Sequence, residues 1–151
     1  MSARIAVVIP SRNRPDELRK AIASVLGTST RADVLVYLDD DQMETYGHLD
    51  ADRVDVFHGP RIGPVASANK LVEWTPGVYE AYLFVPDDAL FLTLGWDEWV
   101  LSEINTFPNR IGAISPYLSG IEYVSCPLVT ARWIKAVGWM ANPKAYHFCW
   151  D

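Results

Sequence analysis

The stretch Tyr82-Leu83-Phe84-Val85-Pro86-Asp87-Asp88-Ala89 decides the fold, because its apolar run stops on two adjacent carboxylates. An unbroken apolar run is typical of a parallel strand whose two faces are both covered. Open α/β sheets bind their ligands beyond the carboxyl ends of such strands. We therefore predict a buried strand at residues 81–85 and a ligand site at Asp87 and Asp88.

A second apolar run also ends on acids. Residues 34–38 have the pattern of a strand, and Asp39-Asp40-Asp41 follow it. An isolated Asp-Asp pair is more often a solvated turn or a helix N-cap, but two strands that both end on acids favour a site. Adjacent carboxylates repel each other. A divalent cation with a phosphate-bearing substrate is the usual compensation, because Mg²⁺ and Mn²⁺ prefer oxygen ligands.

The composition predicts a single globular domain. Half of the 151 residues are apolar and 21% are charged, which is typical of a chain with a proper core. The net charge of −6 argues against a broad nucleic-acid-binding surface, but a small phosphorylated ligand held through a metal remains compatible with it. Cys126 and Cys149 fit no disulfide framework and no metal-ligand spacing. Because no signal peptide or membrane span is recognisable, we expect a soluble cytoplasmic protein; the oligomeric state is not indicated.

Strand and helix patterns alternate along the chain. Pro15 suits the first position of a helix, and Gly27 is expected to end that helix. The early β-α-β-β-α-β order predicts an α/β fold with a mostly parallel sheet and helices on both faces. The other predicted strands are residues 5–10, 54–57, 111–115 and 127–129, and the predicted helices are residues 15–26, 64–74, 96–104 and 131–137.

The loop after the first strand lacks glycine, since none occurs between Ile9 and Leu26. Neither a P-loop nor a dinucleotide-binding G-x-G-x-x-G can therefore follow this strand. The absence argues against ATPases and dehydrogenases, and also against nucleotidyltransferases. The loop reads Pro10-Ser11-Arg12-Asn13-Arg14-Pro15 instead. Positive charge close to the N-terminus of a helix is unfavourable, so a role in ligand binding is favoured for the two arginines over a purely solvated one. Guanidinium groups suit a diphosphate or the edge of a base or ribose.

Together these segments resemble a family 2 glycosyltransferase with the GT-A fold. The matching segments are residues 7–15, 36–41, 59–69 and 84–88, which lie within about residues 5–100. The resemblance implies that a nucleotide-sugar donor binds the loop after the first strand and the acid that ends the second. It also implies that Asn69 forms a hydrogen bond between a helix and a strand. The residues expected at the donor are Pro10, Ser11, Arg12, Arg14, Asp39 or Asp40, Gly63 and Asp87.

The resemblance also implies a metal site. The Asp-x-Asp element of the family binds metal and diphosphate, but its first acid position falls here on Val85. Asp87 and Asp88 remain as ligands for Mn²⁺ or Mg²⁺, with His147 as a weaker third candidate. Phosphate oxygens and waters would complete the octahedron.

The C-terminal part resembles the late Gly-aromatic … His … Asp segment of the family. This pattern, in residues 138–140 and 143–151, implies that Asp151 is the general base for inverting transfer to an unidentified hydroxyl acceptor. Asp97 and Glu98 are reserve candidates, although acids in the first turn of a helix are the simpler interpretation. Residues 1–90 would form the donor half of a single domain, 1–151, and residues 91–151 a short acceptor half. The alternative is a non-catalytic module that binds a nucleotide-sugar or a glycan.

Overall fold

The computed structural model describes residues 4–49, 51–115 and 126–144. Within them, six strands form one sheet in the order β3-β2-β1-β4-β6-β5. The strands β1 to β4 run parallel to their neighbours in this set, and β6 runs antiparallel to both β4 and β5. The mostly parallel sheet is thus confirmed. The strands are β1 (Ile5–Ser11), β2 (Ala32–Asp39), β3 (Val54–Gly59), β4 (Ala81–Phe84), β5 (Ala113–Ile114) and β6 (Leu128–Thr130).

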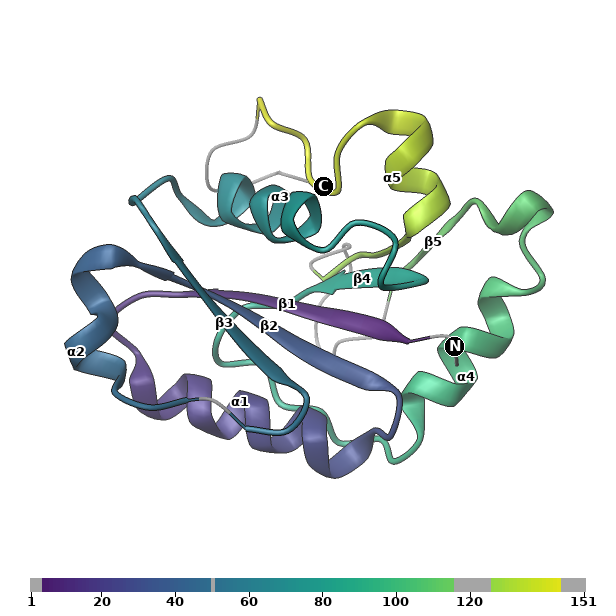
Figure 1. Ribbon diagram of the computed structural model, residues 1–151. Coiled ribbons are helices and arrows are strands. Elements are labelled where there is room, and N and C mark those ends of the chain that lie inside the picture. The colour runs from purple at the N-terminus through teal and green to yellow at the C-terminus, as the bar shows by residue number, and fades with distance from the viewer. Residues whose placement is uncertain (1–3, 50, 116–125, 145–151) are drawn as a thin grey trace.

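Helices cover both faces of the sheet, as predicted (Figure 1). Helices α1 (Pro15–Thr28) and α4 (Trp96–Ile104) pack on one face, and α3 (Pro64–Trp74) and α5 (Ala131–Val137) pack on the other. Shorter elements are the 3₁₀ helix η1 (Asp40–Gln42), the helix α2 (Met43–Tyr46) and the 3₁₀ helix η2 (Pro108–Arg110). No helix in the described ranges is long and apolar enough to cross a membrane.

The interior strands β1 and β2 explain the unbroken apolar runs in the sequence. Every residue of β2 is buried, and in β1 only Pro10 is partly exposed. Because helices cover both faces of these strands, a polar side chain would be buried on either side, and the usual alternation is lost. At the carboxyl ends of these strands the chain turns polar, which brings the acids to the edge of the sheet.

The structure corrects the predicted end of α1. Gly27 lies inside the helix, which continues through Thr28. The hydroxyl groups of Thr28 and Ser29 donate to the carbonyl oxygens of Ser24 and Val25, both at 2.7 Å. These side chains satisfy carbonyl groups of the last turn, so the helix does not need a left-handed glycine to end.

Asn69 fastens α3 to the segment that follows α5. Its Oδ1 accepts from the backbone N–H groups of Met140 and Ala141 at 2.9 and 3.0 Å, and its Nδ2 donates to the carbonyl oxygen of Ala141 at 2.8 Å. A structural hydrogen-bonding role was expected for Asn69, but the partner segment is a loop rather than a strand. The amide is suited to this position because it donates and accepts at the same time.

Candidate functional site

The carboxyl ends of β2, β1 and β4 meet at one edge of the sheet. These three strands are adjacent and parallel, so the residues that follow them emerge on the same side. Ser11 ends β1 and Asp39 ends β2. The backbone N–H of Val85 donates to the carbonyl oxygen of Val8 at 3.1 Å, which extends the pairing one residue beyond β4. We call this region the carboxyl edge.

A tight turn presents the acid pair after β4. The N–H of Ala89 donates to the carbonyl oxygen of Pro86 at 3.2 Å, so Asp87 and Asp88 are the two central residues of a β-turn. Asp87 is 7% exposed, whereas the side chain of Asp88 is 50% exposed. Val85, at the position of the first acid in the family element, is an apolar side chain of the hydrophobic core and has no atom that could bind a metal. The pair thus presents one anchored and one accessible carboxylate.

A chain of hydrogen bonds holds Asp87 in place. The Ser11 hydroxyl donates to Asp87 Oδ2 at 2.6 Å and lies 2.7 Å from the hydroxyl oxygen of Tyr46. Since Ser11 gives its only proton to Asp87, the Tyr46 hydroxyl donates to Ser11. The same Tyr46 oxygen accepts from the backbone N–H of Arg14 at 3.0 Å. Tyr46 belongs to α2 and is fully buried, so α2 positions the site from below its surface.

Arg12 connects the loop after β1 with the acids after β2. Its Nη1 donates to Asp39 Oδ2 at 2.7 Å and to Asp41 Oδ1 at 2.6 Å, and its Nη2 donates to Asp41 Oδ2 at 2.6 Å. The bidentate bond from Arg12 lowers the pKa of Asp41. Asp39 is buried, whereas Asp40 begins η1 and is exposed. Of the two alternatives, these contacts favour Asp39 as the acid that works with Arg12.

Arg14 connects the same loop with the acids after β4. It donates to Asp87 Oδ1 at 3.1 Å and to Asp88 Oδ2 at 3.0 Å, from different guanidinium nitrogens. The hydrogen bond to Asp88 and then the charge of Asp87 raise the pKa of Arg14. Asn13, between the two arginines, also fixes the loop. Its backbone is left-handed, with φ of 59°, and its N–H donates to Gln42 Oε1 at 2.9 Å.

The charges at the carboxyl edge do not balance. Two guanidinium groups, of Arg12 and Arg14, contact four carboxylates. The arrangement is therefore still anionic, and it would repel a diphosphate unless more positive charge arrives. A divalent cation would supply the missing charge, and the available donor atoms are the carboxylate oxygens that Mn²⁺ and Mg²⁺ prefer. Within residues 4–49, 51–115 and 126–144, no cluster of three or more His, Cys, Asp or Glu side chains is arranged to hold a metal.

The other predicted site residues are placed as follows. Pro10 is partly exposed next to Ser11 in β1, and Gly63 precedes α3 with φ of 83°. His147 and Asp151 lie outside the described residues. Asp97 is fully buried and its Oδ2 accepts from the N–H groups of residues 30 and 31, which precede β2. Asp97 thus stabilises the opposite edge of the sheet and is out of reach of the carboxyl edge.

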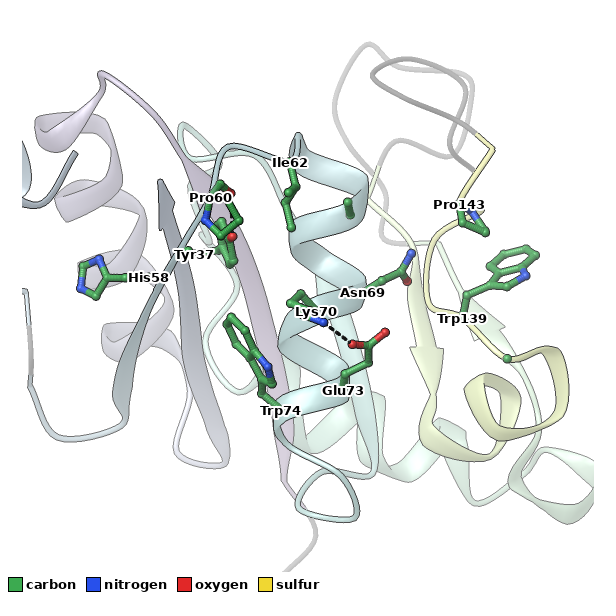
Figure 2. Close-up of a pocket in the computed structure, with 13 residues that line it drawn as sticks. Tyr37, His58, Pro60, Ile62, Asn69, Lys70, Glu73, Trp74, Trp139 and Pro143 are labelled. Atoms are coloured by element: carbon green, nitrogen blue, oxygen red, sulfur yellow. Dashed lines mark hydrogen bonds and ion pairs between the residues drawn. The ribbon is translucent and has the colours of Figure 1, made fainter. Parts of the chain in front are cut away.

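A pocket of about 520 Å³ extends along α3 and is separate from these acids. Figure 2 shows His58 and Trp74 on one flank of the helix and Trp139 and Pro143 on the other. Lys70 pairs with Glu73 at 2.9 Å across the helix surface. None of the residues expected at the donor lines this pocket. The convergence of charged groups therefore singles out the carboxyl edge, not the pocket, as the candidate site.

Removing the Tyr46 hydroxyl is expected to destabilise the protein. Tyr46→Phe leaves the buried Ser11 hydroxyl without its donor and the N–H of Arg14 without its acceptor, so the free energy of unfolding should fall by about 1–3 kcal/mol in urea denaturation. Tyr82→Phe is the matched control, because its buried hydroxyl donates to the Thr75 carbonyl oxygen at 2.8 Å, away from the carboxyl edge. Both variants should lose stability. An unchanged free energy of unfolding in Tyr46→Phe would contradict the positioning role of Tyr46.

No protein-family model and no curated protein matches the sequence. Among solved structures, TarS of S. aureus superposes with a TM-score of 0.63 at 14% identity, over 88% of this chain and 29% of TarS. A variant of the Drosophila β-1,4-galactosyltransferase 7, in complex with manganese, UDP-Gal and xylobiose, superposes with a TM-score of 0.59 at 16% identity, over 93% of this chain and 54% of that one.

The matched structures are GT-A-type glycosyltransferases and related nucleotidyltransferases. The chain has the GT-A fold. A third GT-A-like match is the 4-diphosphocytidyl-2C-methyl-D-erythritol synthase of Anaerococcus prevotii, with a TM-score of 0.53 at 12% identity, over 89% of this chain and 73% of that one. This GT-A domain spans about a third of TarS and about half of the galactosyltransferase.

Proposed function

We propose that this GT-A domain binds a nucleoside-diphosphate sugar at the carboxyl edge and transfers the sugar, with inversion, to a hydroxyl acceptor. One observation carries the proposal: a single loop, through Ser11, Arg12 and Arg14, joins the acids after β2 to the acids after β4. Two arginines and two separate acid groups thus surround one accessible edge of the sheet. The GT-A fold and the UDP-Gal complex of the matched galactosyltransferase support a donor of this class.

The two halves of the carboxyl edge suit different parts of the donor. Asp39 is fixed by Arg12, and its carboxylate can accept hydrogen bonds from the N–H groups of a base or the hydroxyls of a ribose. Pro10 and Gly63 are the further residues that we propose for the donor. Asp87 and Asp88, with Arg14, face the diphosphate. In the proposed division, residues 1–90 form the donor half and residues 91–151 the acceptor half of the domain.

Mn²⁺ or Mg²⁺ fits the Asp87–Asp88 pair. The two carboxylates supply hard oxygen ligands, and the cationic guanidinium of Arg14 already bridges them as a stand-in for a metal ion. When bound there, a divalent cation supplies positive charge against the charge that develops on the leaving diphosphate. We propose His147, which lies outside the described residues, as a third ligand.

The proposed reaction breaks the bond between the anomeric carbon and the diphosphate oxygen, which leaves with both electrons of that bond. The acceptor oxygen attacks the anomeric carbon from the opposite face, through an oxocarbenium-like transition state. The acceptor hydroxyl proton passes to a general base, for which we propose Asp151. The chain positions the donor for this displacement by binding the nucleoside at Asp39 and the diphosphate at Asp87, Asp88 and Arg14.

A thermal-shift panel tests the donor class. UDP, CDP, GDP, ADP and their sugar conjugates are each added with and without Mn²⁺. A ligand that binds only the folded form at a hundredfold excess over its Kd stabilises it by about 2.7 kcal/mol, which raises the midpoint by roughly 5–10 °C. We expect one nucleoside diphosphate to give this shift and Mn²⁺ to increase it. A panel in which no diphosphate raises the midpoint contradicts a donor site at the carboxyl edge.

A binding module without turnover is the second candidate function. It is favoured by one observation, namely that Arg14 occupies both acids of the pair in this arrangement. Release of free nucleoside diphosphate separates the two functions. A transferase hydrolyses its donor slowly in the presence of Mn²⁺ even without an acceptor, whereas a binding module gives the thermal shift and no release.

A further inference from the structure

Arg14 contacts the oxygens that a metal ion would need. Both oxygens of Asp87 have hydrogen-bond donors: Oδ2 accepts from Ser11, and Oδ1 accepts from Arg14 at 3.1 Å. A second guanidinium nitrogen of Arg14 lies 3.0 Å from Asp88 Oδ2. A cation shared by Asp87 and Asp88 would meet the positive charge of the Arg14 guanidinium at both carboxylates, so it has to compete with Arg14 for these oxygens.

The side chain of Arg14 is the part of this arrangement that can move. It is 44% exposed, and Asp88 is 50% exposed, so both can separate into water at low cost. The main chain of Arg14 is fixed, because its N–H donates to the buried Tyr46 hydroxyl. Asp87 is held by Ser11. A departing guanidinium would thus swing about a fixed backbone while the buried acid stays in place.

We propose that Arg14 is the internal counter-cation of the Asp87–Asp88 pair, and that a divalent metal ion binds only by exchanging with it. This inference rests on the proposed donor site. Before the exchange, one guanidinium charge faces two carboxylates. After the exchange, a divalent charge balances both acids, and the released guanidinium is free to contact the diphosphate of the donor. Arg14 keeps the acid pair neutralised in part while no metal is bound.

Mn²⁺ affinity without nucleotide tests the exchange. Arg14→Gln removes the competing cation. The Kd for Mn²⁺, measured by electron paramagnetic resonance of the free ion, should therefore fall by roughly fivefold or more relative to the parent protein. Arg14→Lys keeps the charge but places it on one nitrogen instead of the two guanidinium nitrogens that contact Asp87 and Asp88, and should give a smaller gain. Arg12→Gln removes the same charge from the same loop but contacts Asp39 and Asp41, and should leave the affinity within about twofold.

A double-mutant cycle shows whether the gain arises at the acid pair. In an Asp88→Asn background, Arg14→Gln should no longer tighten Mn²⁺ binding, because the shared site has lost its accessible ligand. Unchanged or weaker Mn²⁺ binding in Arg14→Gln, an equal gain in Arg12→Gln, or no Mn²⁺ binding in any variant each overturns the exchange. Nucleoside-diphosphate affinity of the parent protein measured at saturating Mn²⁺ reports separately on the donor site. Diphosphate binding there, together with no gain in Mn²⁺ affinity in Arg14→Gln, refutes the exchange and leaves the proposed function standing.

Discussion

Asp88→Ala is expected to reduce Mn²⁺-dependent release of nucleoside diphosphate from the donor by roughly a hundredfold or more. Metal stabilisation of a leaving group is worth several kcal/mol, and each 1.36 kcal/mol changes a rate tenfold. The half-exposed side chain of Asp88 contributes little to the fold. The free energy of unfolding should therefore change by no more than about 0.5 kcal/mol. A coupled assay of diphosphate release and a urea denaturation curve measure the two quantities.

Asp16→Ala is the matched control for this variant. Asp16 is also an exposed aspartate in an ion pair, with 3.5 Å between its Oδ1 and a guanidinium nitrogen of Arg19, but it lies in the first turn of α1. Its replacement should leave donor release unchanged. Donor release that is equally fast in the parent protein and in Asp88→Ala would remove Asp88 from the metal site.

Asp39→Asn is expected to weaken nucleoside-diphosphate binding by about tenfold or more, because a charged hydrogen-bond acceptor becomes neutral. The substitution keeps the size of the buried side chain, and Arg12 retains its bidentate pairing with Asp41. The loop should therefore stay in place while the affinity falls. Isothermal titration with the diphosphate identified in the thermal-shift panel measures the change.

Asp40→Asn separates local recognition from general loss of negative charge. Asp40 is the next residue along the chain and is exposed at the start of η1. Removing its charge should leave affinity unchanged or increase it slightly, because an anion then approaches a less anionic edge. A larger loss of diphosphate affinity in Asp40→Asn than in Asp39→Asn would assign nucleoside binding to Asp40 instead of Asp39.

The sequence was sufficient to predict the strand ends and their convergence. Buried parallel strands carry a strong signal, because a polar residue within them costs free energy on either face. The change from apolar to acidic at Asp39 and at Asp87 therefore marked two strand ends correctly. Helices α4 and α5 were also predicted with the bounds that the structure has, since their apolar positions follow the helical period.

The contacts of Tyr46 and Arg14 could not be predicted from such patterns. Helix α2 has four residues, which is too short for periodicity or propensity to reveal, and its existence depends on tertiary packing. The partner of Tyr46 is 35 residues away in Ser11. Arg14 was expected at the donor, next to a diphosphate or to the edge of a base or ribose. Nothing in its local sequence indicates that it contacts Asp87 and Asp88 across 73 and 74 residues.

The buried position of Val85 restricts how this protein can be redesigned. A protein engineer who wanted to strengthen the proposed metal site would first place here the acid that begins the Asp-x-Asp element of family 2 glycosyltransferases. Val85 is 3% exposed among the apolar side chains of the core, and an unpaired carboxylate there costs several kcal/mol, a large share of the stability of an ordinary domain. Added affinity would have to come from the solvent side of the turn, where new oxygen ligands can be introduced without unfolding the scaffold.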